Sequence, residues 1–424
     1  MKRIITIIST LLLTSSVVFA QEADKKVGEL LNTSNWFELE RVYPIVKGDV
    51  QTPMLKLMAE VMLASSFNRP EELREKLQKL IDEHQEELGF ENVCNMSITG
   101  ALTEGFEGNY GVAADMVKAV ADTVKAATGS LEGTGIEELL AYYEDVRDLP
   151  APVLEKPDTD VKIQLTEKSG LLWIPVKING KTYDFIFDTG ASLSFISMNL
   201  ANEFGAKIIS KPVFVGGSGG GGNLQRGLIE KMDVGPISFR NMLALISNNP
   251  SADDPIKVDA VLGMDFIKRL GEIQIDMSDL YLTIPTHGTS LPEYGRNIIF
   301  EQNIPHIEAT DSNGNKLKFI LDTGHSGADL TDLWSSKNME AISVLPTETQ
   351  NTWGHGGIVQ HKIVKVPECT LIIGEGSITF REISAAIPME DSATASYDGN
   401  LGMELLRRFS KITISFDEMF VKCE

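Results

Sequence analysis

The sequence predicts an all-α region in the first third of the chain, followed by an all-β region built from two similar halves. Three observations lead to this fold class. Helical periodicity runs to about residue 149, a proline-rich segment interrupts it, and short β runs with glycine turns follow from about residue 160. Two of these β runs end in the same triplet, Asp-Thr-Gly, at residues 188–190 and 322–324.

Residues 1–20 predict a secretory signal peptide. Lys2 and Arg3 precede an apolar run that ends in small residues before Gln21. The run is too short and wrongly flanked for a membrane anchor, and no other apolar run is long enough to span a bilayer. We therefore expect an exported chain of residues 21–424, periplasmic or extracellular, without a membrane span.

The composition excludes some classes of partner. The formal net charge is −22 at pH 7, and removal of the two cationic residues of the signal peptide takes it to −24. Such an acidic chain repels nucleic acid, and no basic stripe interrupts it. With an odd number of cysteines (Cys94, Cys369 and Cys423) disulfides are not the organising principle, and a Cys369–Cys423 bridge stays open.

Residues 21–150 predict a helical domain. The stretch "PEELREKLQKLIDEH" opens with Pro70 in its first turn and places Leu73, Leu77 and Leu80 on one face. Similar stripes follow in residues 111–127 and 136–149. Paired helices resembling tetratricopeptide repeats and an ordinary helical bundle are both consistent with this pattern, because no clean period emerges.

The stretch "DLPAPVLEKPDTD" breaks the helical pattern with prolines, which places a linker at residues 151–160. Beyond it the two halves of the β region can be aligned. "IPVKINGKTYDFIFDTGAS" corresponds to "IPHIEATDSNGNKLKFILDTGHS", and "AVLGMDFI" corresponds to "GNLGMELL". In each half an Asn-Gly turn predicts a hairpin whose second strand ends at the acid. The β region is therefore a duplicated unit, with lobes at residues 161–290 and 291–424.

Because the β region is duplicated, its two equivalent acids can act together in catalysis. A pseudo-twofold axis brings equivalent loops face to face, so Asp188 and Asp322 are expected to meet. Two adjacent carboxyl groups cannot both ionise easily, and the pair then shares one proton and acts as general acid and general base on a water. Gly190 and Gly324 allow close approach of the other lobe, and the hydroxyls of Thr189 and Thr323 can bond across the interface.

These motifs resemble those of aspartic peptidases of the pepsin/retropepsin type, with two units in one chain. The local motif sequences are similar to those of bacterial retropepsin-like units. The resemblance covers residues 160–424 and implies a bilobal acid-protease fold. It implies that Asp188 and Asp322 are the catalytic pair of an endopeptidase and that Thr189 and Thr323 form the grip between the lobes. It implies no cofactor or metal.

The resemblance also implies two flaps that close on an extended peptide between the lobes. They are the hairpins 216–222 and 353–357, whose predicted substrate-binding residues are Gly217, Ser218, Gly219, Trp353 and Gly354. His325 departs from the family pattern, which has Ser, Thr or Ala after Asp-Thr-Gly. An imidazolium there would stabilise ionised carboxylates; the alternative is a solvent-facing side chain without a role.

Other readings of the chain are weaker. "GGSGGGG" lacks the Gly-Lys-Ser/Thr ending of a phosphate loop, and His355 and His361 have no third metal ligand. The main alternative is a catalytically weak or inactive peptide-binding module, because a fold does not fix an activity. In either case we expect the helical domain to dock a partner protein or to present substrate.

Overall fold

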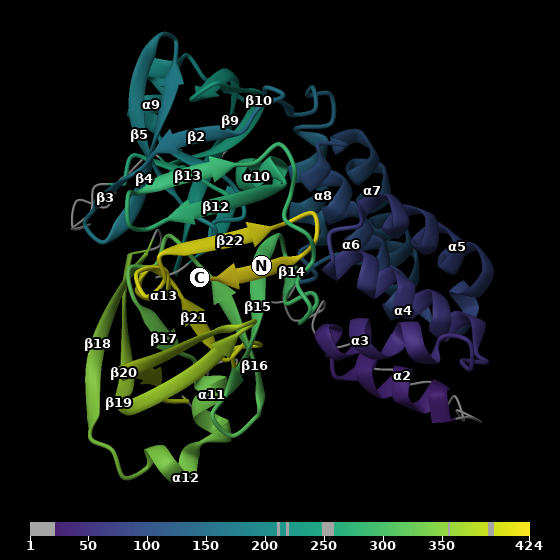
Figure 1. The fold of residues 1–424 in the computed structure, drawn as a ribbon. Helices are drawn as coiled ribbons and strands as arrows, with labels where there is room; N and C mark the ends of the chain where they lie inside the picture. The colour runs from purple at the N-terminus through teal and green to yellow at the C-terminus, as the bar shows by residue number, and fades with distance from the viewer. Residues whose placement is uncertain (1–21, 210–212, 218–219, 248–257, 355–356, 389–393) are drawn as a thin grey trace. The chain divides into compact units, whose positions relative to one another are not determined.

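The computed structural model describes residues 22–209, 213–217, 220–247, 258–354, 357–388 and 394–424 (Figure 1). The predicted signal peptide and the tips of both predicted flaps lie outside these ranges. The chain divides into two compact units, Met1–Ala151 and Pro152–Glu424. We call them the helical unit and the β unit and describe each by itself. No helix among the described residues is long and apolar enough to cross a membrane.

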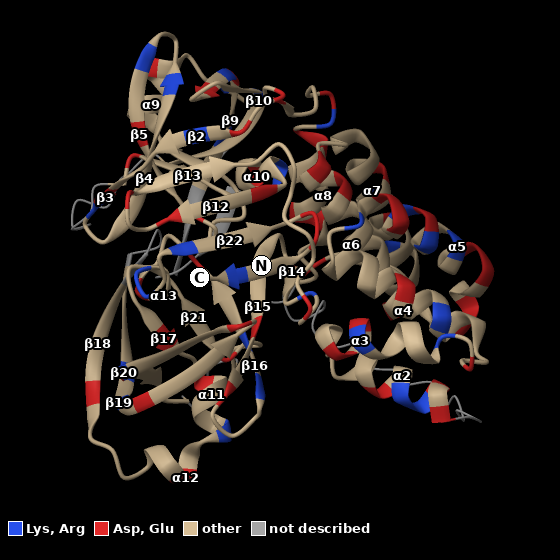
Figure 2. Ribbon diagram, viewed as in Figure 1, with Lys and Arg blue, Asp and Glu red and all other residues tan. Residues whose placement is uncertain are grey.

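The helical unit confirms the predicted all-α region. Its described helices are α2 (Glu22–Asn32), α3 (Trp36–Val46), α4 (Pro53–Ser66), α5 (Pro70–Leu88), α6 (Phe90–Glu107), α7 (Tyr110–Thr128) and α8 (Ile136–Glu144). Helix α5 begins at Pro70, where proline loses no helical hydrogen bond, and buries the predicted stripe of Leu73, Leu77 and Leu80. Figure 2 shows that both signs of charge lie along these helices, whereas the strands of the β unit are mostly uncharged.

The β unit has two lobes, each built on one sheet. The described strands of the first lobe form a ten-stranded sheet: β1 (Val153–Glu155), β3 (Thr166–Lys168), β4 (Leu171–Ile178), β5 (Lys181–Phe187), β6 (Phe195–Ser197), β7 (Lys207–Ile208), β8 (Val213–Gly217), β9 (Gly220–Val234), β10 (Ile237–Ser247) and β11 (Ala260–Leu262). Its short helices are α9 (Met198–Phe204), α10 (Met264–Ile267) and η1 (Lys268–Leu270).

The second lobe repeats this order in an eight-stranded sheet of described residues: β14 (Ile298–Glu301), β15 (Ile304–Asp311), β16 (Lys316–Leu321), β17 (Ala328–Leu330), β18 (Thr347–Gly354), β19 (Gly357–Ile373), β20 (Gly376–Ala386) and β21 (Gly399–Leu401). Its helices are α11 (Asp332–Lys337), α12 (Met339–Ile342) and α13 (Met403–Leu406). The predicted bilobal, duplicated β architecture is thus confirmed.

A third sheet joins the lobes. It runs in the order β2 (Val161–Gln164), β13 (Tyr281–Ile284), β12 (Glu272–Asp276), β22 (Lys411–Ser415) and β23 (Phe420–Cys423). Strands β12 and β22 follow the two Leu-Gly-Met motifs and pair antiparallel, from Glu272 opposite Ser415 to Asp276 opposite Lys411 (Figure 1). Because each lobe supplies one of these strands, their backbone hydrogen bonds fix the lobes against each other.

The hairpins before the two acids differ in detail. Asn179 and Gly180 both have positive φ, 51° and 82°, and form a two-residue turn between β4 and β5, as the Asn-Gly pair predicts. The second turn is longer, and the Asp311 carboxylate accepts from the backbone N–H groups of Asn313 and Asn315. Both turns deliver a strand whose last residue precedes the acid.

Two further predictions can be compared with the structure. The segment expected to be a linker contains strand β1, in which Val153–Glu155 pairs with Arg240–Ser238 of β10. The three cysteines are free thiols, so the disulfide between Cys369 and Cys423 that the sequence left undecided is not formed. Burial raises the pKa of the Cys423 thiol to about 12, which keeps it protonated and unreactive.

Alanine in place of two helical glycines should have opposite effects on the stability of the helical unit. A Cβ on Gly105 in α6 would lie 2.2 Å from Oη of Tyr143, whereas one on Gly111 in α7 would have only ordinary contacts, the nearest at 3.6 Å. We expect Gly105→Ala to lower the free energy of unfolding, because the buried Tyr143 ring must move. Gly111→Ala should raise it by up to about 1 kcal/mol, the helix preference of alanine over glycine. Urea unfolding of the full chain, followed by circular dichroism at the helix band, tests the pair; equal effects would contradict the packing described.

Candidate active site

The two Asp-Thr-Gly loops lie against each other at the junction of the lobes. Each loop leaves a strand whose apolar side chains are buried, Phe185 and Phe187 in β5 and Phe319 and Leu321 in β16. The backbone N–H of Asp188 donates to the carbonyl of Leu262 at 3.1 Å, and that of Asp322 donates to Leu401 at 3.0 Å. The strands β11 and β21 therefore hold both acids at the ends of their own strands.

The threonines bond across the interface as predicted from their hydroxyls. The Thr189 hydroxyl donates to the carbonyl of Leu321 at 2.6 Å and accepts from the backbone N–H of Thr323 at 3.0 Å. The Thr323 hydroxyl makes the matching pair, to the Phe187 carbonyl at 2.6 Å and from the Thr189 N–H at 3.0 Å. Both threonines are fully buried. Four hydrogen bonds thus close a symmetric ring between the loops.

The glycines allow each acid to reach the other loop. A Cβ on Gly190 would lie 2.3 Å from Cγ of Asp322, and one on Gly324 would lie 2.3 Å from Cγ of Asp188. No side chain fits in either place. The Gly190 N–H donates to Oδ1 of Asp188 at 2.8 Å, and the Gly324 N–H donates to Oδ1 of Asp322 at 2.9 Å. Each glycine therefore both makes room for one carboxyl group and orients the other.

The two carboxyl groups are half-buried and hydrogen-bonded to each other. Burial and the neighbouring charge of Asp322 raise the pKa of Asp188 well above its ordinary value. Burial also raises the pKa of Asp322, against the hydrogen bond from Asp188, which favours its ionised form. The pair is therefore set to hold one proton between its two carboxyl groups.

The Leu-Gly-Met motifs support the loops from behind. A Cβ on Gly263 would lie 2.7 Å from the carbonyl oxygen of Ala191, and one on Gly402 would lie 2.1 Å from that of His325. The backbone N–H of Met264 donates to the Ala191 carbonyl, and that of Met403 donates to the His325 carbonyl, each at 2.8 Å. Glycine is thus needed in both motifs because the chain crosses directly behind each loop.

The first loop has a further support that the sequence did not predict. Oδ1 of Asp265 accepts from the backbone N–H of Ser194 at 2.9 Å and from its hydroxyl at 2.7 Å. Burial raises the pKa of Asp265 to about 6, although these hydrogen bonds oppose the shift. The second copy has Glu404 and Ala328 at these places. Comparison of the two copies would therefore hide this support, because only one of them keeps it.

His325 lies beside the second loop and turns toward a carboxylate that the sequence did not single out. Its Nε2 is 3.3 Å from Oδ2 of Asp329, close enough for an ion pair if the ring is protonated, although the angles are not those of a hydrogen bond. Its backbone N–H donates to the carbonyl of Asp322 at 3.1 Å. The side chain is 30% exposed, so it is neither free in solvent nor buried.

The predicted flaps are β hairpins in both lobes. Strands β8 and β9 pair up to Gly217 opposite Gly220, and β18 and β19 pair up to Gly354 opposite Gly357. Ser218 and Gly219 lie outside the described residues. Trp353 lies in β18, opposite Ile358. A substrate-binding role for Gly217, Trp353 and Gly354 stays a prediction.

A clasp between the lobes was also missed from the sequence. The Arg407 guanidinium donates to Oε1 of Glu167 at 2.7 Å, to the carbonyl of Gly170 at 2.9 Å and to that of Ser326 at 3.2 Å. On the other side of the pseudo-axis, the Asn303 amide donates to the Ser192 carbonyl at 3.3 Å. Arg407 therefore connects the first lobe to Ser326, which follows the motif of its own lobe. Asn303 of the second lobe binds Ser192, which follows the motif of the first lobe.

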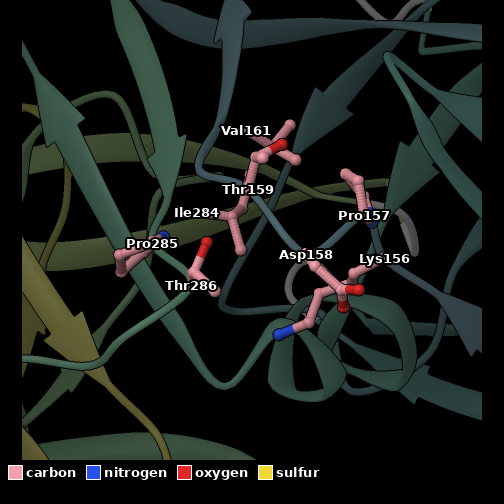
Figure 3. Close-up of a pocket in the computed structure, with 8 residues that line it drawn as sticks. All are labelled: Lys156, Pro157, Asp158, Thr159, Val161, Ile284, Pro285 and Thr286. Atoms are coloured by element: carbon pink, nitrogen blue, oxygen red, sulfur yellow. The ribbon is translucent and has the colours of Figure 1, made fainter.

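A small pocket elsewhere in the β unit lies between the segment before β2 and the end of β13 (Figure 3). Lys156, Asp158, Thr159 and Thr286 are among the residues that line it. The Lys156 ammonium donates to the carbonyl of Leu270 at 2.9 Å. Neither Asp188 nor Asp322 lines this pocket. No group of three or more metal-ligating side chains occurs among the described residues.

The grip gives a test of the interface. Thr189→Val keeps the shape of the side chain but leaves the Leu321 carbonyl and the Thr323 N–H unpaired in a buried site. We expect it to lower the free energy of unfolding by about 2–6 kcal/mol, since each of the two buried unpaired groups costs about 1–3 kcal/mol. Thr189→Ser, which keeps the hydroxyl, should lose much less. Denaturant unfolding of both variants measures these free energies. Equal losses of stability in the two variants would contradict a stabilising role of the hydroxyl hydrogen bonds.

Comparison with known proteins supports the same family. Residues 174–269, which span the first copy from β4 to the Leu-Gly-Met motif and beyond, match the family described as gag-polyprotein putative aspartyl protease. A solved retropepsin-like aspartic protease from Rickettsia conorii is 18% identical, with a TM-score of 0.23, over 31% of this chain and 93% of that one. No curated protein sequence matches the chain. The first copy of the β unit is therefore similar to this aspartyl protease family, and the second copy repeats its Asp-Thr-Gly and Leu-Gly-Met motifs.

Proposed function

We propose that the protein is an aspartic endopeptidase that hydrolyses extended peptides bound between the two lobes of the β unit. The observation that carries the proposal is the hydrogen-bonded pair of Asp188 and Asp322, held by the threonine ring and raised in pKa by burial. Two half-buried carboxyl groups that share one proton are suited to act as acid and base on a single water.

In this mechanism ionised Asp322 takes a proton from water as its oxygen forms a bond to the carbonyl carbon. Asp188 gives its proton to the carbonyl oxygen, which produces a gem-diol. Asp322 then protonates the leaving nitrogen, the carbon–nitrogen bond breaks, and a hydroxyl proton of the diol returns to Asp188. The pair ends in its starting state, and no cofactor is required.

The amino-terminal segment with Lys2, Arg3 and the apolar run supports export, so we place the proteolysis in a periplasm or outside the cell. For the helical unit we propose a docking or substrate-presenting role. Its seven described helices are compact in themselves, which suits a separate binding module.

Asp188→Asn is the decisive substitution. It is close to isosteric and removes the acid, so we expect kcat on a mixed peptide library to fall by roughly 10²–10⁴, the usual contribution of a positioned acid or base. Peptide affinity should persist. Asp279→Asn makes the same change at an exposed aspartate on the turn between β12 and β13 and should leave the rate unchanged. Affinity without turnover in the unsubstituted protein would favour the peptide-binding module instead.

The pH dependence follows from the same pair. Activity requires one proton on the two carboxyl groups, so kcat/KM should rise as the pair loses its first proton and fall as it loses its second. Because both pKa values are raised, the upper limb should lie well above the ordinary carboxyl value of about 4. Rates measured from about pH 3 to about pH 8 should give a bell. A rate that only falls from the most acidic pH upward would contradict the raised pair.

A further inference from the structure

The residues that flank the two acids form matched rows on the sheets. In a strand, alternate side chains point to the same face, so Ile186 shares a face with Asp188, and Ile320 shares one with Asp322. The residues between them, Phe187 and Leu321, are fully buried on the opposite face. Phe187 and Leu321 therefore point into the core, and on the side of the acids Ile186 is also buried whereas Ile320 is half-buried.

Strand register extends each row across the sheet. In the first lobe, partner positions on β4, β5, β11, β6, β10 and β9 are Trp173, Ile186, Val261, Phe195, Leu245 and Arg226. In the second lobe, the corresponding positions on β15, β16, β21, β17, β20 and β19 are His306, Ile320, Asn400, Asp329, Ser384 and Lys365. The two rows use equivalent strands in the same order, so each residue has a counterpart.

The chemistry of the two rows differs where they lie nearest the acids. Phe195 and Val261 of the first lobe are replaced by Asp329 and Asn400 in the second. Leu245 is replaced by Ser384. The first row is thus apolar across its centre, and the second row is polar at the same three positions.

Asp329 is close to the second acid. Burial is the main cause of the raised pKa of Asp322, and the charge of Asp329 adds to it. The Asp329 side chain is 33% exposed and accepts a hydrogen bond from the Asn400 amide at 2.7 Å. Its carboxylate therefore lies near the reacting groups and keeps access to solvent.

The charge of Asp329 is not balanced by a lysine or arginine among the described residues. Among the described residues no lysine or arginine forms an ion pair with it, and its close ionisable neighbour is His325 at 3.3 Å. The Lys365 ammonium, two strands away in the row, donates to the Ser384 hydroxyl at 2.7 Å. Burial lowers the pKa of His306, which disfavours the charged form of that ring. A half-exposed carboxylate without a strong cation is suited to receive one from a ligand.

We propose that the Asp329 row is a subsite for a cationic side chain, and that the Phe195 row is a subsite for a large apolar one. The substrate is then a peptide with lysine or arginine on the Asp322 side of the scissile bond and an apolar residue on the Asp188 side. This inference rests on the proposed endopeptidase function and names its substrate class.

Paired peptides test the proposal. They carry lysine or its apolar analogue norleucine at each position flanking the scissile bond. The unsubstituted protein should cleave one lysine peptide with kcat/KM at least about tenfold above its norleucine partner, a reasonable size for a charge-assisted contact. Asp329→Asn, which keeps the size and an acceptor oxygen, should bring the lysine-to-norleucine ratio to about one. An effect of Asp329 through the pKa of Asp322 would change both peptides alike and leave their ratio untouched.

The control is Asp279→Asn, which should keep the ratio of the unsubstituted protein. No lysine preference in the unsubstituted protein, or a ratio that Asp329→Asn leaves unchanged, would overturn the proposal.

A binding measurement separates this outcome from failure of the endopeptidase proposal. Affinities of labelled lysine and norleucine peptides for Asp188→Asn and for the double variant Asp188→Asn/Asp329→Asn need no turnover. About tenfold weaker binding of the lysine peptide alone in the double variant supports the subsite, even if no peptide is cleaved. Equal losses for both peptides, or no binding by either protein, would refute it.

Discussion

The approach of two loops that each end a buried strand is the constraint on which the β unit depends. Thr189 and Thr323 each place one hydroxyl between a carbonyl and an N–H of the opposite loop, fully out of water. An unpaired polar group at that depth costs about 1–3 kcal/mol. The ring is therefore satisfied only when both loops are in place, and neither lobe can complete it alone.

This closed ring explains the composition of the site around it. Carboxyl groups brought together by the ring leave no space for a side chain at Gly190 or Gly324. The same crowding removes water from Asp188 and Asp322 and raises the pKa of both, so the pair shares a proton. The acid and base properties follow mainly from the packing of the loops, to which the charge of Asp329 adds by raising the pKa of Asp322.

The sequence predicted those parts of the site that occur twice. Paired Asp-Thr-Gly triplets, Asn-Gly turns and Leu-Gly-Met motifs identify equivalent positions without knowledge of strand order. Features that occur once were missed. Asp265 supports Ser194 in the first lobe alone, and the Arg407–Glu167 contact joins residues 240 positions apart. Asp329 becomes significant only through its register with Asn400, 71 residues away. Such pairings depend on tertiary strand order, which local propensity does not contain.

A duplicated single chain also permits what a symmetric dimer forbids. In a twofold assembly of identical chains, a residue such as Phe195 must appear on both sides of the axis, and both acids have the same surroundings. Here the halves have diverged. The threonine ring has kept its symmetry because both loops need it, whereas the rows beside the acids have not. The charge of Asp329 raises the pKa of Asp322, whereas the equivalent position of the first lobe is the uncharged Phe195, so the two acids have different electrostatic surroundings.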